Sequence, residues 1–169
     1  AEEIKPGCAR PTGGPVGEPA SEETIDAIIE EPHKEVKSMI QVGKKAPDFT
    51  APGYFNGQFI NISLSEKLGK WTLLCFYPGD FTFAGAEVSA VADKYDELQK
   101  LGVEVISVSV DSHFVHKMWN DHELIKMVDG GVPFHMLSDQ AGNIGKAYGV
   151  YDEGQGIELR GRFIIDPDG

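Results

Sequence analysis

Apolar residues form three separate strand-like runs in the middle of the chain. The first is short and contains Phe59, Ile60 and Ile62, the second covers residues 71–77 almost without interruption, and the third, residues 103–110, alternates valine with serine. Short apolar runs rich in β-branched and aromatic residues are typical of buried strands. The pattern therefore predicts three strands in this region.

A helical pattern separates the second run from the third. Apolar residues recur at spacings of three and four between residues 87 and 101, and Gly102 follows as a stop signal. A helix of this length between two buried strands connects parallel neighbours by a right-handed crossover. The remaining expected elements are a helix from about residue 112, a strand near 134–137, a helix over 141–148 and a strand over 162–166. The fold class predicted is α/β, a mixed central sheet flanked by helices.

The first quarter of the chain differs in composition from the rest. Residues 1–20 are dense in Gly and Pro and carry too little apolar surface to offset the entropy lost on ordering. A short helix with one apolar stripe is predicted over 22–31, where Pro32 stops it. We therefore expect a flexible tail over 1–20, an N-terminal helix and linker over 21–39, and one folded domain over 40–169.

Both ends of the chain suggest processing or trimming. The first residue is alanine, and no basic region followed by an apolar stretch is present, so no intact signal peptide is recognised and a cytoplasmic location is expected. Residues 166–169 read Asp-Pro-Asp-Gly, a turn directly after an apolar strand. We expect a further C-terminal segment to be missing, because a second hairpin strand should begin there.

Size and charge exclude several classes of protein. A chain of 169 residues is long enough for one domain with a substantial core and short for two. No apolar run approaches the roughly 20 residues that cross a bilayer, so no membrane role is expected. The net charge of -12 and the pI near 4.7 disfavour binding to nucleic acid.

Residues 76–87 carry the most chemical information, and read Phe-Tyr-Pro-Gly-Asp-Phe-Thr-Phe-Ala-Gly-Ala-Glu. Pro78 and Thr82 have the spacing of a Pro-x-x-x-Thr-x-x-Cys motif, which resembles the active-site loop of the peroxiredoxins. The position due for the cysteine is Gly85. The stretch therefore looks like a peroxiredoxin loop without its nucleophile.

The resemblance extends from about Ile40 to the C-terminus and is closest to the alkyl hydroperoxide reductase and typical two-cysteine peroxiredoxins. The matching segments, which occur in the family's order and spacing, are residues 46–49, 80–83, 91–95, 98–103, 111–114, 160–161 and 163–166. The resemblance implies a thioredoxin-like fold with no cofactor. It also implies a hydroperoxide substrate, a thiol reductant such as thioredoxin or a dedicated reductase, and a homodimer or ring of dimers.

The departure from the family is local. The family usually reads Phe-Val-Cys-Pro-Thr-Glu where this chain reads Phe83-Ala84-Gly85-Ala86-Glu87, so three residues stand in place of four and Glu87 takes the place of the family glutamate. Either the nucleophile, a Cys or Sec, was removed, or a residue of the 83–87 loop is absent from this sequence. The polypeptide as written is expected to be inactive because Gly85 has no ionisable group.

The resemblance implies a role for each remaining site residue. Thr82 would hydrogen-bond the peroxide, Pro78 would shield the pocket from water, and Arg160 would stabilise the thiolate and the charge of the transition state. Taken alone, Pro78 is also a common strand terminator and Thr82 a common helix cap. In the family the residue equivalent to Glu87 orients the arginine network, and a carboxylate in the first helical turn also stabilises the helix.

The other reactive side chains fit structural roles better. Cys75 lies within an apolar strand, where cysteine behaves as a small hydrophobe, and Cys8 lies in the tail without a neighbouring base. His113, His116 and His122 share a predicted helix, but no Cys or carboxylate with ligand-like spacing accompanies them. No metal site is expected.

Two functions remain open at this stage. The first is a peroxidase that reduces hydrogen peroxide and alkyl hydroperoxides at a Cys or Sec, in an antioxidant role. The second is a catalytically inactive peroxiredoxin-like scaffold or interaction module, which the shortened loop favours. A thioredoxin-type disulfide reductase is disfavoured because no Cys-x-x-Cys follows the strand at 71–77.

Overall fold

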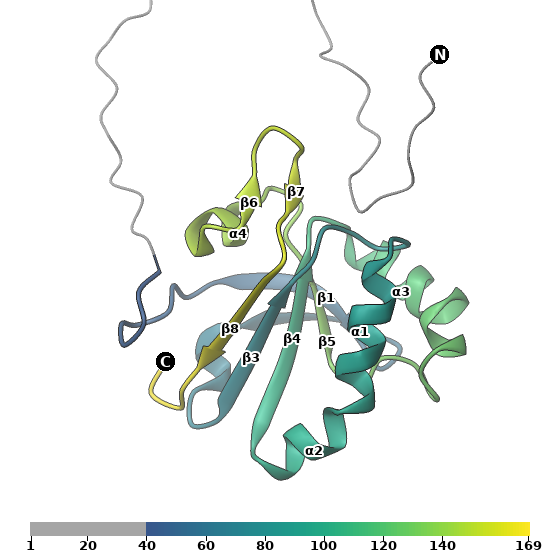
Figure 1. Ribbon diagram of the computed structural model, residues 1–169, viewed down its shortest axis with the longest axis horizontal. Helices are drawn as coiled ribbons and strands as arrows, with labels where there is room; N and C mark the ends of the chain where they lie inside the picture. Colours follow the sequence, from purple (N-terminus) through teal and green to yellow (C-terminus); the bar gives the residue numbers. More distant parts are fainter. Residues whose placement is uncertain (1–39) are drawn as a thin grey trace, which may run out of the picture.

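The computed structural model describes residues 40–169, which fold around one six-stranded sheet (Figure 1). The strand order is β2-β1-β5-β4-β3-β8. The bounds are β1 Thr50–Phe55, β2 Gln58–Ser63, β3 Trp71–Phe76, β4 Val103–Ser109, β5 His135–Ser138 and β8 Gly161–Ile165. Beside this sheet lies a two-stranded ladder of β6 Tyr151–Asp152 and β7 Ile157–Glu158. The expected tail and N-terminal helix lie outside the described residues.

The centre of the sheet is the strand-helix-strand unit that the apolar pattern predicts. Strand β3 pairs with β4 in parallel, from Trp71 opposite Val103 to Phe76 opposite Val108. Strand β5 continues the parallel set beside β4, whereas β8 is antiparallel to β3 and β1 is antiparallel to β5. The predicted mixed α/β sheet is confirmed.

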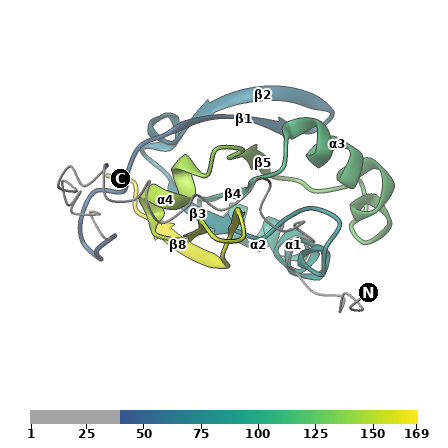
Figure 2. The ribbon, with the colours of Figure 1, turned by 90° about the horizontal axis from the view of Figure 1, so that it is seen from above.

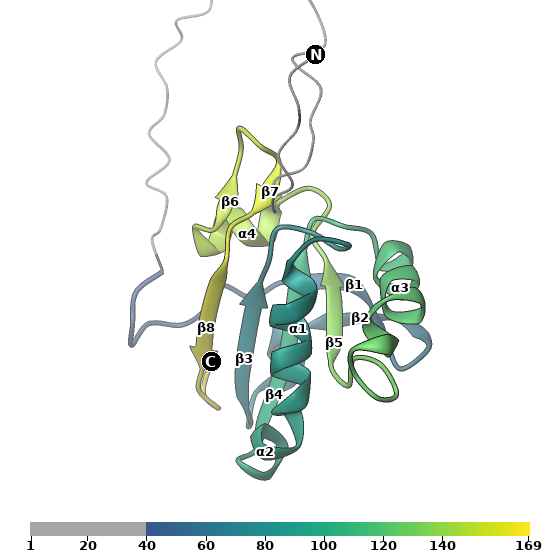
Figure 3. The same cartoon turned by 45° about the vertical axis from the view of Figure 1, so that its right-hand side comes forward.

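Helices cover both faces of the sheet (Figures 2 and 3). Helices α1 Ala84–Asp93, α2 Tyr95–Lys100 and α3 His113–His122 pack on one face, in a core that contains Val88, Trp119 and Met136. Helix α4 Asn143–Tyr148 packs on the other, with Phe76 and Ile106. Short 3-10 helices at Leu64–Lys67 and Leu124–Lys126 complete the elements. No helix within residues 40–169 is long and apolar enough to span a bilayer.

The structure differs from the sequence predictions at two places. The single helix expected over 87–101 begins earlier, at Ala84, and is broken at Lys94, whose backbone leaves the helical region at φ -99° and ψ 1°. The break follows no proline or glycine, so the sequence carries no signal for it. Strand β1 was not predicted, because its residues include Pro52 and Gly53, which are rare inside strands.

Gly53 is required where β1 lies between β2 and β5. A Cβ atom at this position would lie 2.5 Å from Leu137 Cδ2 and 2.6 Å from the Met136 carbonyl oxygen. The Met136 oxygen belongs to the backbone of the neighbouring strand and cannot rotate away. The close approach of β1 to β5 therefore depends on the absence of a side chain.

We predict that Gly53→Ala lowers the free energy of unfolding by about 1–3 kcal/mol, because the added methyl group must push β1 away from β5. Denaturant titration followed by circular dichroism measures the change. Gly154→Ala in an exposed loop is the control and should stay within about 0.5 kcal/mol of the parent. Equal stability of the two variants would contradict the packing described.

Candidate active site

The loop of residues 78–83 joins β3 to α1 at the carboxyl end of the parallel strands. This is the end of an open α/β sheet where sites usually lie. Pro78 is buried at the start of the loop, and Thr82 is half-buried near its end. The position of the loop agrees with the region that the motif singled out.

A buried side chain from within the loop anchors it to the core. The Asp80 carboxylate accepts a hydrogen bond from the Tyr77 hydroxyl at 2.8 Å, and its other oxygen lies 2.8 Å from His116 Nδ1. His116 Nε2 lies 3.1 Å from the Leu137 carbonyl, which can only accept, so Nε2 carries a proton. Burial raises the pKa of Asp80, while the hydrogen bond to His116 opposes that rise. The loop is thus tied to β5 and α3.

A second carboxylate holds the backbone of the same loop. Asp111 Oδ2 accepts from the Asp80 backbone N–H at 2.8 Å and from the Ser109 hydroxyl at 3.1 Å. The next residue, Phe81, is in the left-handed region at φ 56°, which costs a residue other than glycine on the order of 1–3 kcal/mol. The Asp80 side chain and the Asp111 carboxylate both fix the backbone next to Phe81, and together they hold this conformation.

Thr82 closes the start of helix α1 with local hydrogen bonds. Its hydroxyl donates to the Gly79 carbonyl at 2.8 Å and accepts from the Ala84 N–H at 3.2 Å. The Gly85 N–H donates to the Thr82 carbonyl at 3.1 Å, and the Ala86 N–H donates to the Phe83 carbonyl at 3.3 Å. The backbone N–H groups of the first turn, which could otherwise stabilise an anion, therefore donate to residues 82 and 83 just before them.

Gly85 is buried in the first turn of α1, and a Cβ atom added there would meet its neighbours without a clash. A Cβ atom there would lie 3.5 Å from Trp119 Cζ2, 3.5 Å from Glu123 Oε1 and 3.7 Å from Met127 Sδ. These are ordinary contact distances. A side chain at position 85 would thus face α3 and the residues that follow it.

Glu87 is held by two guanidinium groups at β8, the edge strand that pairs with β3. Arg160 Nε donates to Glu87 Oε1 at 2.6 Å, and Arg162 Nη2 donates to Glu87 Oε2 at 3.1 Å. Arg162 Nη1 also donates to the Phe76 carbonyl at 2.9 Å, at the end of β3. The expected contact between Arg160 and Glu87 is present. Arg162 in β8 was not predicted as a site residue, because its only signal in the sequence is its place two residues after Arg160.

Cys75 lies behind this cluster as a structural residue. It is buried in β3 opposite Arg162 of β8. Burial raises the pKa of the Cys75 thiol, and the positive charge of Arg162 only partly opposes the effect. Since the thiolate is the reactive form, Cys75 is a poor nucleophile.

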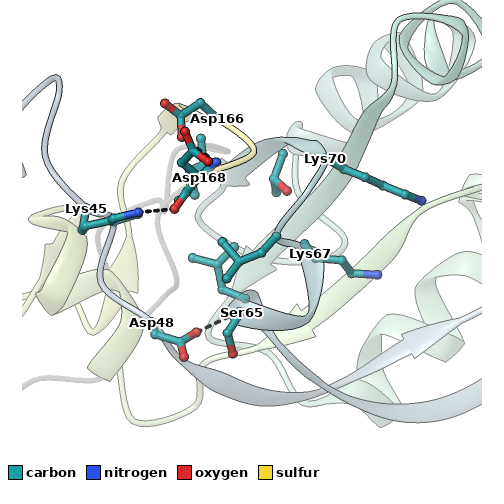
Figure 4. A pocket seen from close by; sticks show the side chains of 13 residues that line it. Lys45, Asp48, Ser65, Lys67, Lys70, Asp166 and Asp168 are labelled. Carbon is teal, nitrogen blue, oxygen red and sulfur yellow. Dashed lines mark hydrogen bonds between the residues drawn. The ribbon is translucent and has the colours of Figure 1, made fainter.

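A cavity within residues 40–169 lies at the other end of the sheet. It measures about 300 Å³ and is lined by residues before β1, around the start of β3 and after β8. Figure 4 shows Lys45 reaching Asp168 and Asp48 reaching Ser65 at its wall. None of Pro78, Thr82, Gly85, Glu87 and Arg160 lines this cavity. The candidate site, at the loop and the start of α1, is therefore separate from this cavity.

Known proteins share both the sequence pattern and this fold. Residues 42–169 match the family model described as the AhpC/TSA family. The chain is 70% identical over 132 residues to a selenocysteine-containing peroxiredoxin PrxU of Peptoclostridium acidaminophilum, and 44% identical over 130 residues to the chloroplastic 2-Cys peroxiredoxin BAS1 of Hordeum vulgare. These matches cover 78% and 76% of this chain.

A solved structure agrees with the architecture. The crystal structure of Enterococcus faecalis AhpC superposes with a TM-score of 0.69 at 40% identity, covering 75% of this chain and 74% of that one. The chain spans 65% of the length of the PrxU relative and 62% of the BAS1 relative. With the family model matched over most of its length, the chain belongs to the AhpC/TSA family of peroxiredoxins.

Proposed function

We propose that the protein is a peroxidase that reduces hydrogen peroxide and alkyl hydroperoxides at a nucleophilic Cys or Sec in the 83–87 loop. The observation that carries the proposal is the pair of guanidinium groups on Glu87 at the start of α1. A positively charged group beside a helix N-terminus favours a thiolate or selenolate and the negative charge that develops when an O–O bond breaks. Arg160 is the proposed catalytic arginine.

The length of the loop supports one additional residue between Ala84 and Gly85. A residue there would stand three positions after Thr82 and three before Glu87, which is the spacing of the family motif on both sides. Gly85 itself satisfies only the first of these two spacings.

The nature of the nucleophile is proposed from the relatives. The PrxU relative, 70% identical, is named for a selenocysteine, and the BAS1 relative is named as a 2-Cys peroxiredoxin. The higher identity to the selenocysteine protein favours Sec at this position. A selenolate is the stronger candidate on chemical grounds as well, because selenols ionise more readily than thiols.

The proposed reaction proceeds in two balanced steps. The anionic sulfur or selenium attacks one oxygen of the hydroperoxide, the O–O bond breaks, and the departing alkoxide takes a proton to leave as an alcohol. The nucleophile becomes a sulfenic or selenenic acid. Two equivalents of thiol then return it to the reduced state, releasing water and a disulfide. Thioredoxin or a dedicated reductase is the proposed thiol source.

Each of the described site residues has a separate proposed role. Thr82 would orient the peroxide through its hydroxyl, and Pro78 would limit access of water. Glu87 would fix the direction of the Arg160 guanidinium, since Arg160 Nε is already committed to it. Asp80 keeps the loop that carries Pro78 and Thr82 in place through Tyr77 and His116.

We predict that the 169-residue polypeptide lacks peroxidase turnover and that a cysteine inserted between Ala84 and Gly85 restores the first oxidation step, because the loop then holds an ionisable group at the helix start. Stopped-flow measurement of peroxide consumption, with mass spectrometry of the added oxygen, tests the prediction. The inserted variant should react at least about 100-fold faster than a free thiol.

Gly85→Cys is the matched control for that experiment. Its Cβ fits without a clash, so it places a thiol in the same pocket but two residues before Glu87 rather than three. It should react more slowly than the inserted variant. In the protein isolated from its own cells, the tryptic peptide covering residues 71–94 should carry one extra residue containing selenium or sulfur. If the inserted variant does not react with peroxide, the assignment of the active site is wrong and the scaffold function is favoured.

A further prediction concerns the two arginines. In the cysteine-inserted protein, Arg160→Met should slow the reaction with peroxide by about 100-fold or more, as expected for loss of one preorganised charge-stabilising donor. Arg162→Met should cause a smaller loss, because Arg162 holds Glu87 and the Phe76 carbonyl. Rapid-mixing kinetics on folded variants measure both, and equal rates for all three proteins would contradict the assignment of Arg160.

The protein is also proposed to form a homodimer or a ring of dimers. Several large apolar side chains near the loop and α3 are exposed, namely Phe59, Phe81, Phe83, Phe114 and Met118. The Phe59 and Phe114 rings lie 5.0 Å apart, so part of this set forms one apolar surface. Exposed apolar surface of this kind commonly marks a protein interface.

We predict a dimer or larger assembly at micromolar concentration, because a partner subunit would remove these aromatic side chains from water. Multi-angle light scattering on the full protein gives the mass directly. Phe114→Ser should shift the distribution toward smaller species, while Phe163→Ser, a half-buried core change, serves to separate loss of assembly from loss of folding. A parent protein that is monomeric under these conditions would refute the assembly.

A further inference from the structure

Glu158 is a buried acid that the proposed reaction does not use. It lies in β7 opposite Tyr151 of β6, and it is fully buried, with 0% of its surface exposed. Neither Oε1 nor Oε2 has a hydrogen-bond partner among residues 40–169. A buried carboxylate without donors is costly, on the order of several kcal/mol. The group therefore needs an explanation.

A glycine on α4 makes room for this carboxyl group. A Cβ atom on Gly145 would lie 1.9 Å from Glu158 Oε2 and 2.4 Å from Glu158 Cδ. Any residue other than glycine at position 145 would displace the Glu158 head group. The close approach is thus a feature of this pair of residues, which lie 13 positions apart in the sequence.

The neighbouring charged group is another acid. Asp139 follows β5, is itself buried, and accepts a hydrogen bond from the Gly145 N–H at 2.9 Å through Oδ2. The groups that face Glu158 from the other elements are Gly145 on α4 and Tyr151 on β6, while Lys146 of α4 lies over the Tyr151 ring at 4.9 Å. Within the described residues, the charge that acts on Glu158 is that of Asp139.

Two carboxyl groups can hydrogen-bond to each other only if one of them holds a proton. As carboxylates both are acceptors alone, which is why the Glu158 oxygens are left without donors. Burial, together with the nearby Asp139 carboxyl group, raises the pKa of Glu158 to about 9. The absence of donors near Glu158 and its close packing against Gly145 therefore both favour a protonated Glu158 side chain.

We propose that Glu158 is a positioning residue, which stays protonated in the folded protein at neutral pH, donates a hydrogen bond to Asp139 and thereby fixes the strand that leads to Arg160. The link to the site is the backbone, because Leu159 N–H donates to the Val150 carbonyl at 2.6 Å and Arg160 follows directly. Loss of the proton places two negative charges together in a buried space and separates β7 from α4. The functional part of this proposal rests on the proposed role of Arg160.

The pH dependence of stability tests the protonation. The folded pKa of about 9 lies above the ordinary value of 4.5, so the folded state binds more protons and the contribution to stability falls as pH rises from about 5 to 9. Glu158→Gln keeps a donor toward Asp139 and cannot ionise. Relative to Glu158→Gln, the folded-to-unfolded ratio of the parent should fall by up to about tenfold per pH unit in this range.

Glu153→Gln, an exposed change in the same hairpin, is the control and should keep the slope of the parent. Infrared spectroscopy at pH 7 should show a protonated-carboxyl carbonyl band in the parent that is absent from Glu158→Gln. Parallel pH profiles for the parent and Glu158→Gln, or no such band, would overturn the protonation.

A double-mutant cycle tests the geometry. Gly145→Ala should destabilise the parent strongly, because its methyl group occupies the place of the Glu158 carboxyl, and should cost much less in a Glu158→Ala background. Additive effects of the two changes would mean that the groups do not meet.

The effect on Arg160 is read without enzyme turnover. The Nε–H resonance of Arg160, hydrogen-bonded to Glu87, should shift with pH near 9 in the parent and stay constant in Glu158→Gln. A resonance that titrates equally in both proteins would reject the positioning role. This readout does not depend on the peroxidase assignment, so loss of either conclusion can be recognised separately.

Discussion

The buried Asp80 carboxylate is the interaction on which the loop and its surroundings depend. Its side chain and that of His116 are fully buried, and each hydrogen-bonding atom faces a partner. Removing one partner from a buried pair of this kind typically costs about 3–5 kcal/mol. The core therefore imposes the conformation of the loop, including the left-handed backbone of Phe81, which the residue would not adopt by its own preference.

A second constraint acts from the opposite side of the site. Glu87 lies in the first turn of α1, while Arg160 directly precedes the edge strand β8 and Arg162 lies within it. These ion pairs are partly exposed, so solvent screens them and their contribution to stability is small. Their value is geometric, because two guanidinium planes on one carboxylate fix its direction.

The sequence predicted the parts of the fold that depend on local pattern. The strands at 71–77 and 103–110 and their parallel pairing followed from apolar runs and the length of the connection. Strand β1 was missed because pairing on both sides outweighs the poor strand propensity of Pro52 and Gly53. The break at Lys94 was missed because nothing in its neighbours marks it.

The site divides in the same way. Pro78, Thr82, Glu87 and Arg160 were identified by motif resemblance. Arg162 and the Asp80 network depend on contacts between residues distant in sequence, and no motif marks them. The departure from the family motif at Gly85 was visible in the sequence, whereas the hydrogen bonds of the first-turn N–H groups required the structure.

The close packing of Gly145 against Glu158 also limits the order in which substitutions at these two positions can accumulate during evolution. If Gly145 is replaced while Glu158 is still present, the new side chain clashes with the Glu158 carboxyl group. If Glu158 is first replaced by a small residue, either choice is open at position 145. The order of the two substitutions therefore matters, because Gly145 can be replaced without a clash only after Glu158 has been replaced.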